Sequence, residues 1–231
     1  MKYLVTTDWL EKNSTNVKIL DASWHMPNTK RNGLKEYQIK HIADSQFFDL
    51  DQTSNKYSKL PHMLPSKNSW EKSISQLGIK NSDHIIIYDN SDVLSSCRIW
   101  YNFLYFGHSS SLVSVLDGGL IKWIKENRDT TKIINKIHKS DYIAEENTAM
   151  VLSKDQINSN IKSKTFELID ARSKERFNGL QPEPRKELRG GNIKGSKNIP
   201  FMDLINKNDH TFKNKDELKS VFNQLDLDLT K

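Results

Sequence analysis

The segment Val17-Lys-Ile-Leu-Asp21-Ala-Ser decides the fold, because the chain repeats it as Phe166-Glu-Leu-Ile-Asp170-Ala-Arg. Each copy is a short apolar run that ends in Asp, a pattern typical of a buried strand whose carboxyl end opens into a loop. A second short strand is predicted after each copy, at Gln46 to Phe48 and at Asn198 to Ile199. The repeat therefore predicts two units built in the same order.

Further elements continue this order along the first copy. A helical pattern covers Ser69 to Leu77, and its counterpart in the second copy covers Lys215 to Leu225. The first copy then predicts an apolar strand, a helix, another strand and a closing helix, at Ile85 to Asp89, about Arg98 to Phe106, Val113 to Asp117, and Leu120 to Asn127. Strands that alternate with helices predict an α/β fold, in which each domain is a parallel sheet flanked by helices.

The second copy stops earlier than the first. When Leu225 is aligned with Leu77, Lys231 falls opposite Asp83, so the counterpart of the Ile85 strand would begin just after the last residue. We therefore expect a second domain that is incomplete in this sequence, truncated relative to the functional gene product. The predicted organisation is a first domain over residues 1–128, a polar linker over 129–150 and a partial second domain over 151–231.

Composition excludes several classes of protein. Of the 231 residues, 35% are hydrophobic and 28% charged, which is typical of a globular protein with a core. No apolar run approaches the ~18–20 residues that cross a bilayer, and the first 19 residues are too polar for a signal peptide, so we expect a cytoplasmic protein without a membrane partner. The net charge is +6, but the lysines are scattered without interleaved aromatic residues. Nucleic-acid binding is therefore not expected, whereas a small anionic substrate would be attracted.

Cysteine and histidine usage limits the available chemistry. Cys97 is the single cysteine, which excludes an intramolecular disulfide and a Cys-rich metal site. The seven histidines are dispersed without ligand spacing, so no metal centre is expected. The sequence also lacks a phosphate-binding loop, a Gly-x-Gly-x-x-Gly turn and a Gly-x-Ser-x-Gly elbow, so no cofactor is expected.

Several short motifs resemble one known family in their order and spacing. The chain resembles the tandem rhodanese-domain sulfurtransferases, which act on 3-mercaptopyruvate or thiosulfate. The residues that carry this resemblance include Leu20-Asp-Ala-Ser-Trp24, Phe47-Phe-Asp-Leu-Asp51, His62-Met-Leu-Pro65, Arg98-Ile-Trp100, Leu116-Asp-Gly-Gly119, Asp170-Ala-Arg172 and Pro182-Glu-Pro-Arg185.

The resemblance implies a mechanism of sulfur transfer. A small anionic donor passes sulfane sulfur to a cysteine in a Cys-Gly-Ser-Gly-type loop of the second domain, and the persulfide then passes it to a thiol or cyanide acceptor. That loop would start shortly after Lys231, so the nucleophilic cysteine is missing from this chain. The resemblance therefore implies a sulfurtransferase whose 231 residues are inactive by themselves.

The resemblance also assigns roles to four residues. Arg176 and Arg185 match the pair that holds the substrate carboxylate, a role suited to a planar cation. Asp51 and His62 match the first-domain members of a Ser/His/Asp-type relay, whose hydroxyl would lie in the missing loop. Without the resemblance, His62 is more often a loop histidine bonded to backbone than a catalytic one, Asp51 is equally a turn cap, and Arg185 is a solvated loop cation.

Three other residues are assigned less chemistry. Asp21 and Asp170 stand at strand ends, where a carboxylate anchors neighbouring backbone N–H groups. The repeat places Asp89 where the second domain would carry its cysteine, so Cys97 does not match the nucleophile. A helix start and the adjacent Arg98 would lower the pKa of the Cys97 thiol, whereas a buried free cysteine is an inert small hydrophobe.

An alternative function belongs to a different class. The chain would be a non-catalytic rhodanese-like binding or regulatory module that has lost its nucleophile. Translating the nucleotide sequence beyond codon 231 separates the two hypotheses, because truncation predicts a strand followed by Cys-Gly-Ser-Gly.

Overall fold

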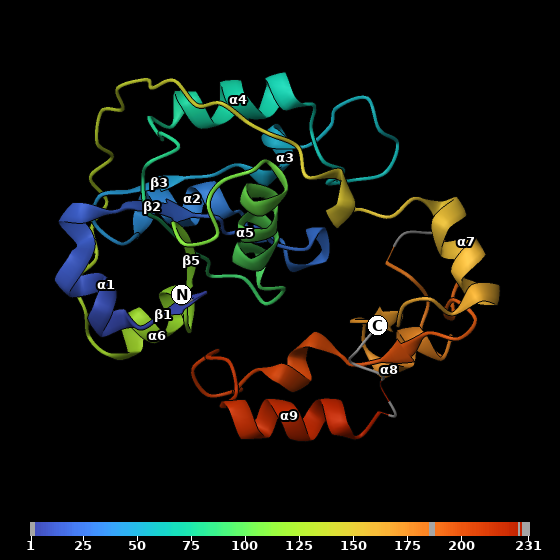
Figure 1. The fold of residues 1–231 in the computed structure, drawn as a ribbon. Helices are drawn as coiled ribbons and strands as arrows, with labels where there is room; N and C mark the ends of the chain where they lie inside the picture. The colour runs from blue at the N-terminus through green and yellow to red at the C-terminus, as the bar shows by residue number, and fades with distance from the viewer. Residues whose placement is uncertain (1–2, 185–187, 226, 228–231) are drawn as a thin grey trace. The chain divides into compact units, whose positions relative to one another are not determined.

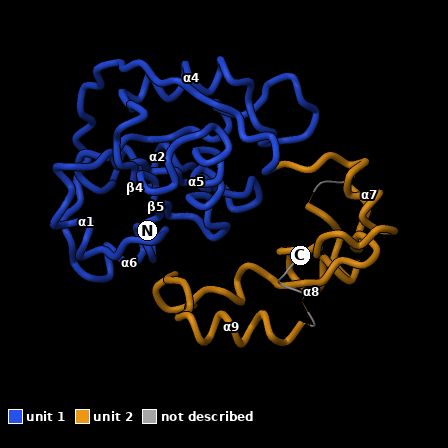
Figure 2. The backbone as a smooth tube through the Cα atoms, in the orientation of Figure 1, with its two compact units in different colours: residues 1–150 blue, residues 151–231 orange. Residues whose placement is uncertain are grey.

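The computed structural model describes the chain except for residues 1–2, 185–187, 226 and 228–231 (Figure 1). It divides into two compact units, Met1–Met150 and Val151–Lys231 (Figure 2). The second unit begins at the residue where the sequence analysis places the partial second domain.

Unit 1 contains a parallel sheet of five strands in the order β1-β5-β4-β2-β3. The strands are β1 (Leu4–Val5), β2 (Lys18–Asp21), β3 (Ser45–Phe47), β4 (Ile85–Tyr88) and β5 (Val113–Leu116). Every pairing is parallel, and β2 lies between β3 and β4, with Leu20 paired to Gln46 on one side and to Ile87 on the other. Because the strands are parallel, the loops that follow β2, β3 and β4 meet at one edge of the sheet.

Helices cover both faces of this sheet, as can be followed in Figure 1. They are α1 (Thr7–Asn13), α2 (Gly33–Ile39), α3 (Leu50–Thr53), α4 (Lys67–Gln76), α5 (Ser95–Tyr105) and α6 (Gly119–Lys125), with short 3-10 turns at Ser14–Asn16, Pro27–Thr29 and Thr148–Met150. On one face, Trp70 of α4 stacks on Phe106 and packs edge-on against Phe103 of α5. On the other face, Leu10 of α1 and Trp123 of α6 join a second apolar cluster. This confirms the predicted α/β fold with a parallel sheet flanked by helices.

Capping side chains determine where several helices begin. The Ser66 hydroxyl accepts the Ser69 N–H at the start of α4, and Asn32 accepts the Lys35 N–H at the start of α2. Each cap satisfies a donor that the first helical turn leaves without an intrahelical partner. Helix α5 begins at Ser95, three residues before the expected start near Arg98, because the Asp89 carboxylate accepts the Ser96 N–H at 2.7 Å.

Two buried carboxylates organise the loops at the carboxyl edge of the sheet. Asp21 accepts the Ser23 N–H at 2.9 Å, and Asp89 accepts the Ser91 N–H at 2.9 Å. Each carboxylate thus closes the turn directly after its strand. The bond to Ser23 confirms the predicted anchoring role of Asp21. Burial raises the pKa of Asp21 to about 6, and the nearby Asp89 adds to this effect.

The segment 129–150, expected as a linker, belongs to unit 1. Its main chain forms an isolated bridge between Thr131 and His41, and its Tyr142 and Ala144 side chains are buried against the main apolar cluster. The Tyr142 hydroxyl lies 3.3 Å from Nδ1 of His108. The structure here differs from the expected boundary at residue 128, because main-chain hydrogen bonds from Ser140, Glu145 and Asn147 also attach this otherwise polar segment to unit 1.

Unit 2 has a smaller sheet among its described residues. Its elements are α7 (Lys154–Ser163), β6 (Ile169–Asp170), α8 (Lys174–Phe177), β7 (Lys197–Asn198) and α9 (Lys215–Asn223), with a 3-10 turn at Phe201–Leu204. Strand β6 pairs in parallel with β7, as β2 pairs with β3. Reciprocal capping boxes start α7, through Ser153 and Gln156, and α9, through Asn214 and Glu217.

The two copies of the repeat differ in how deeply their apolar side chains are buried. Ile169 is 39% exposed, whereas its counterpart Leu20 is 0% exposed, because β4 lies beside β2 and no described strand lies on that side of β6. Helix α9 contains no buried residue, although its first copy, α4, buries Trp70 and Ile74. The described part of unit 2 therefore repeats the order of strands and helices of unit 1, but its apolar side chains are less buried.

We predict that Asp21→Asn changes how the stability of unit 1 depends on pH. The folded pKa of Asp21 is raised above its ordinary value of 3.8, so the folded state binds the proton more tightly. This stabilisation is fully present below about pH 4 and is lost as the pH rises through about 6. The wild-type free energy of unfolding should therefore fall by on the order of 3 kcal/mol relative to Asp21→Asn between pH 4 and pH 7.

Urea titrations followed by tryptophan fluorescence can measure this difference, since all five tryptophans lie in unit 1. A difference between the two proteins that stays constant over this pH range would contradict the prediction.

Candidate functional site

Asp51 and His62 form a hydrogen-bonded pair in unit 1. Asp51 lies in the first turn of α3, and His62 lies in the loop that precedes α4. Nε2 of His62 is 2.8 Å from Oδ1 of Asp51. The Asp51 side chain is 65% exposed and that of His62 is 21% exposed, so the pair is open to solvent. The cap of α3 is Asp49, which accepts the Gln52 N–H, so Asp51 is not the turn cap.

Two residues that the sequence does not connect with this pair also contact it. The indole N–H of Trp24, from the loop after β2, donates to both carboxylate oxygens of Asp51 at 3.2 and 3.1 Å. The Arg98 guanidinium donates from Nη2 to the main-chain carbonyl of His62 at 2.7 Å. Both residues belong to motifs that carry the family resemblance, but sequence spacing does not indicate which side chains they contact.

The backbone of His62 has an unusual conformation. Its φ is 53°, in the left-handed region that non-glycine residues seldom adopt. The hydrogen bond from Arg98 holds the His62 carbonyl in this conformation, and burial lowers the pKa of the Arg98 guanidinium. A backbone in a sparsely populated region costs free energy and persists only when the surrounding structure stabilises it. Such residues are often found at functional sites.

Arg176 of unit 2 lies in an ionic cluster. It belongs to α8, and its Nη2 donates to Oε2 of Glu183 at 2.5 Å. Arg172 donates to the other Glu183 oxygen at 2.6 Å and to the Asp170 carboxylate at 2.5 Å. The hydrogen bond from Arg176 lowers the pKa of Glu183, whose side chain is only 2% exposed, and that from Arg172 lowers the pKa of Asp170.

The charges of this cluster balance, since two guanidinium groups face two carboxylates. Glu183 also engages Nε and Nη2 of Arg176, and the bond to Nε is long, at 3.4 Å. A guanidinium has five N–H donors, and no acceptor among the described residues is bonded to the Nη1 group of Arg176. Arg185, the expected second arginine, lies outside the described residues.

Asp170 anchors its loop as the sequence predicts. Its Oδ1 accepts the Arg172 N–H at 2.9 Å, which repeats the contact between Asp21 and Ser23 in unit 1. The Arg172 guanidinium adds further bonds to the same carboxylate. Asp170 is therefore a structural anchor in the loop that carries Arg176.

Cys97 lacks the surroundings of a nucleophile. It lies in the first turn of α5, and burial raises the pKa of its thiol to about 12, with the nearby Asp89 carboxylate adding to the shift. A reactive cysteine needs the opposite change, because only the thiolate attacks. This favours the inert small hydrophobe over the thiol activated by Arg98.

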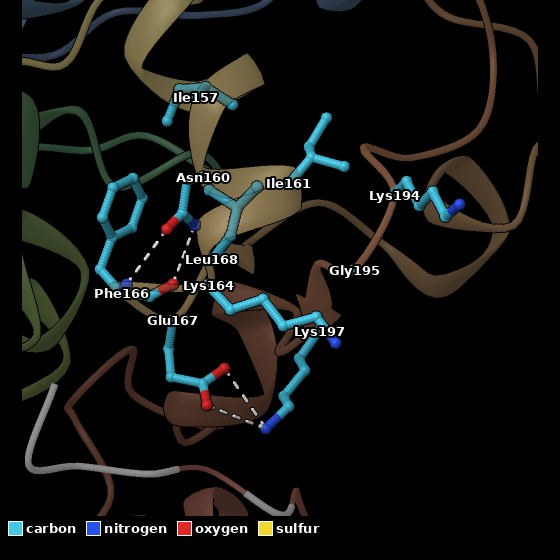
Figure 3. Close-up of a pocket in the computed structure, with 10 residues that line it drawn as sticks. All are labelled: Ile157, Asn160, Ile161, Lys164, Phe166, Glu167, Leu168, Lys194, Gly195 and Lys197. Carbon is cyan, nitrogen blue, oxygen red and sulfur yellow. Dashed lines mark hydrogen bonds and ion pairs between the residues drawn. The ribbon is translucent and has the colours of Figure 1, made fainter.

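A cavity of about 260 Å³ lies in unit 2 between α7, the segment 164–168 that precedes β6, and residues 194–197 (Figure 3). Its wall includes Ile157, Phe166 and Leu168, and Lys197 pairs with Glu167 near it. In the repeat, Phe166 and Leu168 correspond to Val17 and Ile19, which belong to the second apolar cluster of unit 1. In unit 1 that cluster is completed by β4, β5 and α6. We therefore interpret the cavity as the place where apolar core residues of unit 2 lack the neighbouring strands and helix that cover their counterparts in unit 1.

The described residues offer neither a candidate metal site nor a candidate membrane-spanning helix. No group of three His, Cys, Asp or Glu side chains there is placed to hold a metal ion. None of the described helices combines the length and apolar character that crossing a bilayer requires.

A family model and several known proteins match this chain. The rhodanese-like domain family matches residues 6–126. A thiosulfate/3-mercaptopyruvate sulfurtransferase of Arabidopsis thaliana, described as mitochondrial, is 39% identical over 99% of this chain and 65% of its own length. A 3-mercaptopyruvate sulfurtransferase of Mus musculus is 34% identical over 99% of this chain and 78% of its own length. The chain thus spans about two thirds to four fifths of these relatives.

A solved structure shows the same likeness. SseA from Escherichia coli, described with the rhodanese fold and catalytic mechanism of 3-mercaptopyruvate sulfotransferases, superposes with a TM-score of 0.89 at 29% identity. The match covers 99% of this chain and 85% of SseA. Since one relative is named as mitochondrial, the expected cytoplasmic location stays a prediction.

We predict that Cys97 reacts slowly with thiol reagents in the folded chain. With its pKa raised to about 12, the thiolate fraction at pH 8 should be roughly a thousandfold below that of an ordinary cysteine. Labelling by iodoacetamide, followed by intact-mass spectrometry, should accelerate once urea unfolds unit 1. Labelling of the folded chain as fast as that of the unfolded chain would show that Cys97 is reactive.

Proposed function

Since this chain belongs to the rhodanese-like family of sulfurtransferases, we propose that it supplies the donor-binding and proton-handling residues of a sulfurtransferase. The donor is 3-mercaptopyruvate or thiosulfate, and the acceptor is a thiol or cyanide. The observation that carries this proposal is the hydrogen-bonded pair of Asp51 and His62, which the sequence resemblance assigns to proton handling.

Arg176 binds the donor anion in this proposal. Its planar guanidinium suits a carboxylate, which favours 3-mercaptopyruvate, although thiosulfate is also an anion. Glu183 neutralises part of the charge of Arg176, so Arg185 provides the additional positive charge. Two observations support this role. Glu183 engages Nε and Nη2 of Arg176 and not its Nη1 group. The nine-residue spacing of Arg176 and Arg185 matches the family.

His62 handles the proton of the reaction. The attacking thiolate takes the sulfur of 3-mercaptopyruvate, the C–S bond breaks, and its electron pair leaves with the carbon as the enolate of pyruvate. The enolate then gains a proton, and His62 holds or delivers that proton while Asp51 stabilises the imidazolium. The acceptor, such as cyanide, attacks the outer sulfur of the persulfide and restores the thiolate.

The reacting thiolate lies outside residues 1–231 in this proposal. Cys97 is the single cysteine among them, and its raised pKa argues against a nucleophilic role. The same observation favours the second candidate function, a non-catalytic rhodanese-like binding module. The two candidates differ in whether the protein made in its native cells carries a reactive cysteine beyond these residues.

An assay of sulfur transfer tests the proposal. We expect the protein isolated from its native cells to form thiocyanate from cyanide with 3-mercaptopyruvate or thiosulfate. The 231-residue chain should form none above the uncatalysed rate, and Cys97→Ser should change neither result. The intact mass of the native protein shows whether residues beyond 231 are present.

Two outcomes of this assay would count against the proposal. Turnover by the 231-residue chain that Cys97→Ser abolishes would make Cys97 the nucleophile. A native protein that ends at residue 231, binds the donor and transfers no sulfur would support the binding module instead.

We also predict that Arg176→Ala weakens donor binding by the 231-residue chain. Loss of a charge-assisted hydrogen bond should raise the dissociation constant for 3-mercaptopyruvate about tenfold or more, as measured by isothermal titration calorimetry. Arg189→Ala is the matched control, since Arg189 lies in the same connection between β6 and β7, is exposed and contributes the same charge. Equal losses in the two variants would indicate a general effect of charge and would exclude a specific role for Arg176.

A further inference from the structure

Trp24 is held by the loops at the carboxyl edge of the sheet in unit 1. Its main-chain N–H donates to the Ser95 hydroxyl at 3.1 Å, and its carbonyl accepts a hydrogen bond from the Ser91 hydroxyl. Both serines belong to the loop and first helical turn that follow β4. Because the loop after β4 holds both main-chain groups, the main chain of Trp24 is held in place by a second loop as well as by its own.

The Trp24 indole orients the carboxylate of Asp51. One N–H donor lies 3.2 Å from Oδ1 and 3.1 Å from Oδ2, so it approaches both oxygens nearly equally. A carboxylate that is 65% exposed would otherwise rotate freely among solvent molecules. With the indole on one side, Oδ1 is directed toward Nε2 of His62, which lies 2.8 Å away.

The same indole also contacts the imidazole of His62. The two ring centroids are 4.7 Å apart and the ring planes are 81° apart, an edge-to-face arrangement. The ring of His62 is thus restricted by Trp24, while its main chain is held by Arg98. Both members of the Asp51 and His62 pair therefore depend on one tryptophan from another loop.

We propose that Trp24 is a positioning residue that orients both Asp51 and His62 and selects one tautomer of His62. When Asp51 accepts from Nε2, neutral His62 carries its proton on Nε2, and Nδ1 is the nitrogen that accepts a proton. The geometric part of this inference is independent of sulfur transfer. Its catalytic part rests on the proposed function of the Asp51 and His62 pair.

A purely structural role is the competing explanation. Trp24 packs at the border of the main apolar cluster, so its ring also contributes to the core. Trp24→Phe separates the two explanations, because phenylalanine keeps an aromatic ring at this position and removes the N–H donor. Asp51→Asn is a second variant that should not disturb folding, since the Asp51 side chain is largely exposed.

Nuclear magnetic resonance of the ¹⁵N-labelled 231-residue chain is the direct test. The five tryptophans give five indole signals, and Trp24→Phe identifies the signal of Trp24 by its loss. In the wild type, the imidazole nitrogens of neutral His62 should report mainly the Nε2–H tautomer. In Trp24→Phe, the ratio of the two tautomers should shift toward Nδ1–H by roughly fivefold to tenfold, as loss of a hydrogen bond to a carboxylate allows.

The second variant and a control complete the test. Asp51→Asn should move the Trp24 indole signal, because the charged acceptor is lost. Trp100→Phe is the matched control, since the Trp100 indole donates to the Val113 carbonyl at 3.3 Å, and it should leave the His62 tautomer unchanged. An unchanged tautomer ratio in Trp24→Phe, or an unmoved indole signal in Asp51→Asn, would overturn the inference.

Sulfur transfer by the native protein separates this inference from the proposed function. We expect Trp24→Phe to lower kcat severalfold with little change in the KM of the donor, and to have no further effect once His62→Ala is present. If His62→Ala leaves kcat unchanged, the proposed role of the pair fails, while the tautomer ratio still decides whether Trp24 positions it.

Discussion

The parallel pairing of β2 between β3 and β4 is the constraint on which the rest of unit 1 depends. Parallel strands end at the same edge, so Trp24 after β2, Asp51 after β3, and Ser91, Ser95 and Arg98 after β4 are brought together there. None of these contacts is local in sequence, and each is made between loops that the sheet holds at a defined spacing. The buried carboxylates of Asp21 and Asp89 then close the turns from which the loops depart.

Charge is arranged differently in the two units. In unit 1, Arg98 donates to a carbonyl, so its guanidinium stabilises the backbone of His62. In unit 2, Glu183 forms ion pairs with both Arg172 and Arg176. These ion pairs hold the two guanidinium groups in place and neutralise part of their positive charge. In the proposed function, such preorganisation would reduce the entropy lost when a donor anion binds, and specificity would then depend on the N–H groups of Arg176 that Glu183 does not engage.

The two copies of the repeat show what a covered sheet face contributes. Leu20 and Ile19 are buried because β4 and the helices beyond it cover them, whereas Ile169 is partly exposed and Leu168 borders a cavity. The local order of strand, loop and helix is nevertheless the same in both units. Local sequence is therefore sufficient for the order of elements, and burial of the core requires the neighbouring strands.

The sequence by itself determined the repeat, the α/β class, the strands that end in Asp21 and Asp170, and the residues to examine at the candidate site. These features depend on short-range periodicity and on strand ends, which are visible in a linear pattern. Only the tertiary structure showed that Trp24 and Arg98 contact the Asp51 and His62 pair, that Glu183 engages Arg176, and that burial raises the pKa of the Cys97 thiol. Those outcomes depend on which loops the parallel sheet brings together and on how deeply a group is buried, and neither property is a function of spacing along the chain.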